Sequence, residues 1–220
     1  MGLSDQEVQY FISTIKNYSE YDFSGYSEKS LKRRIQKVLN DYRMDIPTML
    51  TKFKNNRELI YEVVKSITVN TTELFRDPKI WQDLRFRILP KLSDNKNINI
   101  WHAGCSTGQE VYSMLILLNE LGLFDKAKII ATDLNEDALK MAKNGIYKYR
   151  FNINYLDNFD KVIKENPFNY EEYNDVPYDK YFKINKSEDK LIMNEFLKEK
   201  PIFRKHWKTC GISCRIICPL

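Results

Sequence analysis

The sequence predicts an α/β chain whose N-terminal part is all helical and whose later part alternates strands with helices. Apolar residues recur at helical spacing from residue 4 to about residue 75. The segments NINIW (97–101) and AKIIA (127–131) are predicted strands, and a glycine-containing loop, HAGCSTGQE (102–110), follows the first of them. We therefore expect a helical domain over residues 1–75 and a second domain over residues 76–220.

The helical part has recognisable start signals. Ser4 followed by Glu7 forms a capping-box pattern before VQYFISTI. Ser27 or Ser30 is expected to cap the helix SLKRRIQKVLNDYRM. Pro47 is expected to open a third helix, and residues 58–67 to form a fourth.

The second of these helices has one apolar face and one basic face. Arg33, Arg34 and Lys37 lie on the basic face. Two interpretations remain open from the residues alone: a solvated helix face, or a face that docks an acidic partner.

The second domain begins after Thr68, where poor helix formers replace the helical pattern. A helix is expected over IWQDLRFRILPKL (80–92), then a strand, the loop, a helix over 109–121, and a second strand ending near Asp133. Asn135 is expected to cap the following helix. This order is that of a right-handed βαβ unit of the Rossmann-like, dinucleotide-binding kind.

The rest of the chain is expected to add strands to this unit. A hairpin over 181–183 and 191–193 lies in a small inserted β-subdomain around residues 155–200. Residues 201–204 are expected to add a third strand to the main sheet.

The loop itself indicates the kind of ligand. Gly104 and Gly108 allow sharp turns and close approach, and the helix after the loop offers free N–H groups around Ser106. Glu110 stands in the first turn of that helix, where a carboxylate repels a pyrophosphate and attracts a positive centre. S-adenosylmethionine carries a sulfonium and an ammonium and no phosphate. Asp133, at the end of the second strand, is expected to accept hydrogen bonds from ribose hydroxyls.

Two other activities fit parts of the loop less well. A nicotinamide-dependent oxidoreductase would need G-x-G-x-x-G rather than G-x-S-x-G. A hydrolase with Ser106 on a nucleophile elbow would need a downstream histidine, and His206 is the only one.

Composition sets the remaining bounds. The net charge of +5 permits an acidic partner without demanding nucleic acid. No apolar run reaches the length of a membrane span and no cleavable leader is seen, so we expect a cytoplasmic location without membrane insertion. The four cysteines match no known cluster spacing, so we expect free thiols and no metal.

Three motifs in order resemble the CheR-type chemotaxis receptor methyltransferases: SITVNTTELFRDP, WHAGCSTGQEVYSMLILL and ATDLNEDALKMAKNGIY. The resemblance extends over about residues 5–206. It implies methyl transfer from S-adenosylmethionine to glutamate side chains of methyl-accepting chemoreceptors, with S-adenosylhomocysteine as product. It also implies a Rossmann-like methyltransferase domain after the helical domain, and the cytoplasmic helical domain of the receptors as partner.

The resemblance also implies roles for particular residues. Asn70, Thr72 and Arg76 would line the cofactor and acceptor site, with Arg76 gripping the acceptor carboxylate. Glu110 and Asp133 would hold the cofactor, and the basic helix would dock the receptor. From the residues alone, Thr72 also suits a helix cap, and Arg76 a surface ion pair with Asp77 or Glu73.

The last fifteen residues depart from the family pattern. Trp207 stands where a small polar residue is expected, and Ile216 breaks a Cys-Arg-Asn run. We therefore expect a chain that is truncated or frame-shifted after about His206, with an incomplete sheet. The alternative function is a module that binds receptor or cofactor with impaired turnover.

Overall fold

The computed structural model describes residues 3–68 and 72–205, which fall into two compact units. The first is helical and the second holds both sheets. The sequence places residues 72–75 with the helical part, but they group with the second unit, because Leu74 and Phe75 are fully buried in its core.

Four helices build the first unit: α1 (Asp5–Tyr18), α2 (Glu28–Tyr42), α3 (Ile46–Phe53) and α4 (Arg57–Ile67). Side chains at helical spacing fill its core, among them Phe11, Ile15, Leu31, Ile35, Met49, Phe53, Val63 and Ile67.

The predicted helix starts are largely confirmed. Ser4 and Glu7 form the reciprocal capping box of α1. Ser27 occupies the N-cap position of α2, but its side chain makes no capping hydrogen bond. Asp45, two residues ahead of the predicted start at Pro47, caps α3 by accepting from the N–H of Thr48 at 2.9 Å.

The predicted helix over residues 80–92 is broken in the structure. It consists of α5 (Pro78–Asp83), a π-helical turn (Leu84–Ile88) and a 3-10 turn (Leu89–Leu92). Two causes are visible. Pro90 has no N–H to continue the α-helical ladder, and Arg85 is buried with its Nη1 bonded to the carbonyls of Val162 and Ile163.

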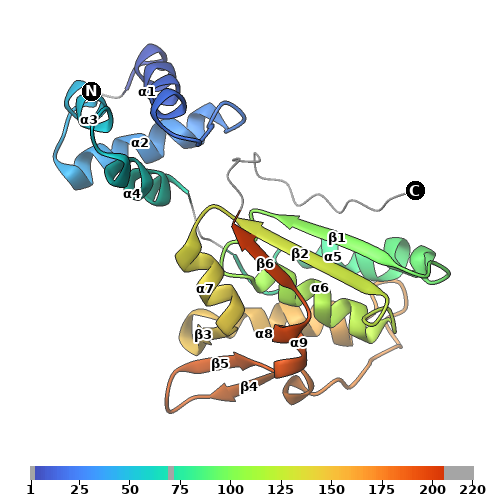
Figure 1. Cartoon of the computed structure of the whole chain (residues 1–220). Coiled ribbons are helices and arrows are strands. Elements are labelled where there is room, and N and C mark those ends of the chain that lie inside the picture. The colour runs from blue at the N-terminus through green and yellow to red at the C-terminus, as the bar shows by residue number, and fades with distance from the viewer. Residues whose placement is uncertain (1–2, 69–71, 206–220) are drawn as a thin grey trace. The chain divides into compact units, whose positions relative to one another are not determined.

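The main sheet has three parallel strands: β1 (Ile98–Ala103), β2 (Ala127–Asp133) and β6 (Ile202–Lys205), in the order β1-β2-β6. They lie side by side in Figure 1, and the prediction of all three is confirmed. Helix α6 (Gln109–Glu120) connects β1 to β2, and α7 (Glu136–Asn144) follows β2. All three strands end at the same edge of the sheet, and this edge carries the loop after β1.

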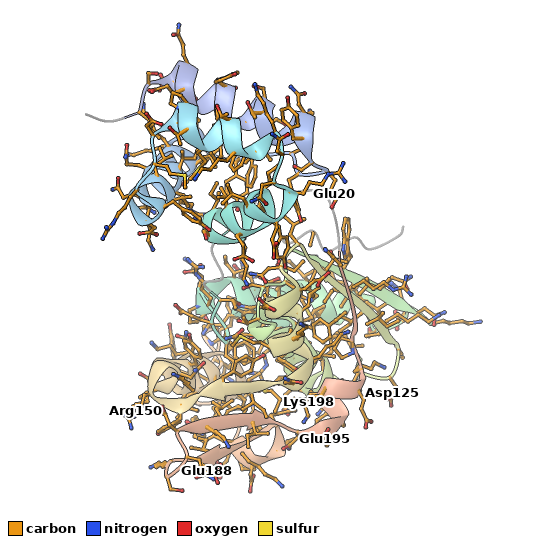
Figure 2. All side chains as sticks on the ribbon, turned by 60° about the vertical axis from the view of Figure 1, so that its left-hand side comes forward. Glu20, Asp125, Arg150, Glu188, Glu195 and Lys198 are labelled. Carbon is orange, nitrogen blue, oxygen red and sulfur yellow. The ribbon has the colours of Figure 1, made fainter. Side chains whose placement is uncertain are left out.

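The inserted sheet is also present and is larger than predicted. β4 (Phe182–Asn185) and β5 (Lys190–Met193) form the predicted hairpin, with Glu188 at its turn (Figure 2). A third strand, β3 (Ile146–Lys148), pairs with β5 and was not predicted because three residues give no readable alternation.

Short helices lie between β3 and β4: α8 (Ile153–Phe159), a π-helical turn (Asp160–Lys164) and 3-10 turns at Tyr149–Phe151 and Tyr178–Lys180. Helix α9 (Glu195–Glu199) connects β5 of the inserted sheet to β6 of the main sheet. On α9 the ammonium of Lys198 lies 2.6 Å from the carboxylate of Glu195 (Figure 2). No helix in the described part of the chain has both the length and the apolar character needed to span a membrane.

Candidate cofactor site

The loop after β1 is shaped by left-handed backbone conformations. Gly104, Ser106 and Gly108 have φ values of 80°, 51° and 91°. The N–H groups of Gly104 and Cys105 both donate to the carbonyl of Thr132, at 2.8 and 2.9 Å. The loop therefore turns tightly around the end of β2, in a conformation that glycine adopts at little cost.

Gly104 and Gly108 have different structural roles. A Cβ on Gly108 would stand 2.8 Å from the Cβ of Ala142 in α7, so this glycine permits close packing of loop and helix. A Cβ on Gly104 would meet nothing within 4 Å. Gly104 therefore borders open space, and Gly108 is needed for packing.

Asp133 holds the loop through both of its carboxylate oxygens. Oδ2 accepts from the N–H of Ser106 at 2.7 Å, and Oδ1 accepts from the N–H of Asn135 at 2.9 Å. Asn135 in turn caps α7, as predicted, by accepting from the N–H groups of Asp137 and Ala138. The predicted bond to a ribose would add to this role, since a carboxylate has about four acceptor positions.

Glu110 is fixed by a residue that the sequence analysis missed. Nδ1 of His102, in β1, lies 2.9 Å from Oε1 of Glu110. The histidine side chain is fully buried, whereas the Glu110 side chain is 37% exposed. The alternation of β1 carried a signal, because it places His102 on the same buried face as Ile98 and Ile100.

The loop lies in a region of negative electrostatic potential. Burial raises the pKa of the Cys105 thiol well above its usual range, and the nearby carboxylates of Asp133 and Glu110 raise it further. The carboxylates of Asp133 and Glu110 therefore both place negative charge near Cys105. Such a site favours a ligand with positive centres and disfavours a pyrophosphate.

The residues present fit S-adenosylmethionine on two further observations. The hydroxyl of Ser106 is buried and has no hydrogen-bond partner within the described residues, so the loop offers an unused polar group. The space beside Gly104 is open. Together with Glu110 and Asp133 these groups would hold a cationic nucleoside. His206, the downstream histidine that the nucleophile-elbow interpretation requires, lies outside the described residues.

The turn that carries Arg76 is anchored beside this loop. The N–H of Phe75 donates at 2.8 Å to the hydroxyl of Ser113, which itself donates to the carbonyl of Gln109 in the first turn of α6. Phe75 and Asp77 both have left-handed backbones, with φ of 51° and 55°. Such conformations are costly for non-glycine residues and are typical of functional turns. They present Arg76 as an exposed side chain next to the helix that bears Glu110.

Thr72 belongs to the same turn. Its carbonyl accepts a long hydrogen bond, 3.4 Å, from the hydroxyl of Tyr155 in α8. No described helix begins at Thr72, so the interpretation as a helix cap is wrong. Asn70 lies outside the described residues, and so do Trp207 and Ile216, on which the expectation of a truncated chain rests.

The three predicted docking residues of α2 differ in their exposure. Arg33 and Lys37 are exposed, as a docking face requires. Arg34 is half-buried, and its Nη1 donates at 2.9 Å to the carbonyl of Ile67 at the end of α4. Arg34 lies next to the apolar face of α2. Because α2 packs on α4, the Arg34 side chain points inward. Arg34 therefore stabilises the helical unit.

The fold and the site together define a class: a Rossmann-like domain built for S-adenosylmethionine. Residues 70–172 match the family described as CheR methyltransferase, SAM binding domain. This part of the chain therefore matches the S-adenosylmethionine-binding domain of the CheR methyltransferases, and S-adenosylmethionine is the cofactor of that domain.

Curated relatives agree with this assignment. The chain is 36% identical over 157 residues to a Pseudomonas putida protein named as the methyltransferase Cher3, covering 71% of this chain and 58% of that protein. It is 34% identical over 167 residues to a chemotaxis protein methyltransferase of Borreliella burgdorferi (71% and 52% covered). A Listeria monocytogenes protein of the same name is 28% identical over 149 residues (66% and 57% covered). The chain thus spans somewhat more than half the length of these relatives.

Proposed function

We propose that this chain transfers methyl groups from S-adenosylmethionine to glutamate side chains of methyl-accepting chemoreceptors. The observation that carries the proposal is the pairing of two carboxylates, Glu110 and Asp133, around a glycine loop of the CheR family. The names of the relatives, chemotaxis protein methyltransferases, support the receptor as substrate.

When bound, S-adenosylmethionine supplies an activated methyl group on its sulfonium. The chain contributes binding and alignment. Asp133 fixes the loop and accepts from the ligand's hydroxyls, while Glu110 attracts its positive end. Holding the two reactants in register is worth several orders of magnitude in rate.

Arg76 is the proposed catalytic residue on the acceptor side. A glutamate side chain is already ionised at neutral pH, since its reference pKa is about 4.3, so no general base is required. The forked donors of an arginine suit a carboxylate and fix its orientation. The anchored turn around Arg76 supports this role, because Phe75 and Ser113 connect it to α6.

The proposed receptor contact uses the exposed basic residues of α2. Arg33 and Lys37 offer positive charge without a structural task among the described contacts of the helical unit. The cytoplasmic helical domain of a chemoreceptor, which displays glutamates, is the proposed partner. A cytoplasmic location for the chain is part of the same proposal.

The test is methyl transfer from tritiated S-adenosylmethionine to receptor-containing membranes, scored as base-labile methyl esters. We expect esters with the wild-type chain, and at least a hundredfold slower formation with Arg76→Ala, the scale of lost orientation. Arg76→Lys is the matched control, because it keeps the charge and loses the fork. A chain that binds S-adenosylhomocysteine but forms no esters would instead be a binding module.

A further inference from the structure

The contact between His102 and Glu110 joins a buried residue to a half-exposed one. His102 lies near the carboxyl end of β1, opposite Ala131 of β2 in the sheet register. Glu110 is the second residue of α6. The contact between Nδ1 and Oε1, 2.9 Å, therefore bridges the two elements that the loop connects.

Without a hydrogen-bonding partner such as His102, the carboxylate of Glu110 could adopt other orientations. It has three rotatable bonds, and fixing them costs conformational entropy on ligand binding. It also stands in the first turn of α6, where backbone N–H groups compete for a carboxylate. A fixed donor removes both difficulties in advance, which is the general advantage of a preorganised site.

His102 is suited to this task because its own position is fixed. Its side chain has no exposed surface, and it shares the inner face of β1 with Ile98 and Ile100. The backbone around it is held in the sheet, and the hydroxyl of Thr132 lies 3.4 Å from its carbonyl. The ring can therefore aim a donor at Glu110 without adjustment.

We propose that His102 is a positioning residue of the cofactor site. With the proton on Nδ1 it donates to Glu110 and holds that carboxylate toward the positively charged amino-acid end of the ligand. The inference rests on the proposed function, since it concerns the same site. It adds a residue to that site and names the part of the ligand that this residue affects.

The test uses a matched pair of amides. In His102→Asn the side-chain nitrogen takes the place of Nδ1, so the donor to Glu110 is kept. In His102→Gln the nitrogen is one carbon farther out, near the place of Nε2, so a polar side chain is kept but the donor is displaced. Calorimetric titration with S-adenosylhomocysteine is expected to give near wild-type affinity for His102→Asn and about tenfold weaker affinity for His102→Gln.

Two controls separate positioning from general damage. 5′-Methylthioadenosine lacks the amino-acid end, so its affinity is expected to be the same in all three proteins. In a Glu110→Gln background the difference between the His102 variants is expected to vanish, because the charge that they position is absent. A fold defect would instead weaken both ligands and lower the midpoint of urea unfolding.

The outcomes are distinct. If wild type binds no S-adenosylhomocysteine, the proposed function fails. If wild type binds it and His102→Gln binds it equally well, or His102→Asn fails to rescue, the positioning role of His102 is overturned.

Discussion

The carboxylate of Asp133 accepts a 2.7 Å hydrogen bond from the backbone N–H of Ser106, which ties the end of β2 to the loop that follows β1. Asp133, at the end of β2, therefore has a structural role in holding the loop. Any contact with a ribose is added to a carboxylate that is already oriented.

Replacement of Asp133 by alanine is therefore expected to weaken the site in two ways, through the lost ligand contact and through a loosened loop. We expect the affinity for S-adenosylhomocysteine to fall by about 1–3 kcal/mol, the scale of hydrogen bonds to a charged acceptor. Calorimetry measures this directly. An unchanged dissociation constant would remove Asp133 from the site.

The two loop glycines are expected to separate folding from binding. Gly108→Ala places a Cβ 2.8 Å from the Cβ of Ala142, so we expect it to destabilise the second unit by about 1–3 kcal/mol in urea unfolding. Gly104→Ala meets no atom within 4 Å and is expected to cost only about 1–2 kcal/mol, for its left-handed backbone.

Ligand binding should rank the glycine pair differently. The methyl group at Gly104 enters the space left for the ligand, so Gly104→Ala is expected to lose more affinity for S-adenosylhomocysteine per unit of lost stability. A loss of affinity in Gly104→Ala that is no greater, per unit of lost stability, than the loss in Gly108→Ala would contradict the assignment of this space to the ligand.

Charge reversal on α2 tests the docking face. We expect Arg33→Glu with Lys37→Glu to lower receptor methylation about tenfold at low salt and less at high salt, because exposed charges are screened. Binding of S-adenosylhomocysteine should not change. Full methylation by the double variant at low salt would mean that the face is merely solvated.

Arg34 serves as the contrasting position on the same helix. Its bond to the carbonyl of Ile67 predicts that Arg34→Gln lowers the stability of the helical unit by about 1–2 kcal/mol. A variant with unchanged thermal unfolding would return Arg34 to the docking face.

The Cys105 thiol is expected to be inert in the folded protein. Its pKa is raised by burial and by the two carboxylates, so the thiol stays protonated at a pH where an exposed cysteine ionises. Peptide mapping after iodoacetamide treatment at pH 8 should show Cys105 modified only after unfolding. Rapid native alkylation would contradict the described burial.

The raised pKa of the Cys105 thiol also makes the free energy of unfolding depend on pH. A thiol whose pKa is higher in the folded state than in the unfolded state contributes stability below the unfolded pKa, near 8.5, and loses it as pH rises further. The free energy of unfolding is therefore expected to fall above about pH 8.5, and Cys105→Ala should reduce this slope.

The sequence predicted the parts of this fold that obey a period or a cap. The capping box at Ser4, the strands around Ile100 and Ile129, and the cap at Asn135 all follow from local chemistry. The break in the helix over residues 80–92 was predictable only in part. Pro90 is visible in the sequence, but the π-helical turn at Leu84–Ile88 also depends on Arg85 reaching carbonyls 77 and 78 residues away.

The site was predictable to the same degree. The loop glycines and Glu110 lie in one motif and Asp133 lies in the next, so the sequence identified all of them as candidates. Side-chain contacts between different elements were not predicted: the hydrogen bond of Arg34 to Ile67, and the contact of His102 with Glu110. From the sequence alone, a single histidine on a buried strand face is interpreted as a core residue. Only the fold shows that a carboxylate contacts it.

The most direct measurement for the central claim is a pair of calorimetric titrations, S-adenosylhomocysteine and NADH, against wild type and Glu110→Gln. A loop with a carboxylate in the first turn of α6 should bind the amino-acid nucleoside and reject the pyrophosphate. We predict binding of S-adenosylhomocysteine that weakens about tenfold in Glu110→Gln, and no heat with NADH. Binding of NADH by the wild-type chain, or S-adenosylhomocysteine affinity that does not depend on Glu110, would contradict the account.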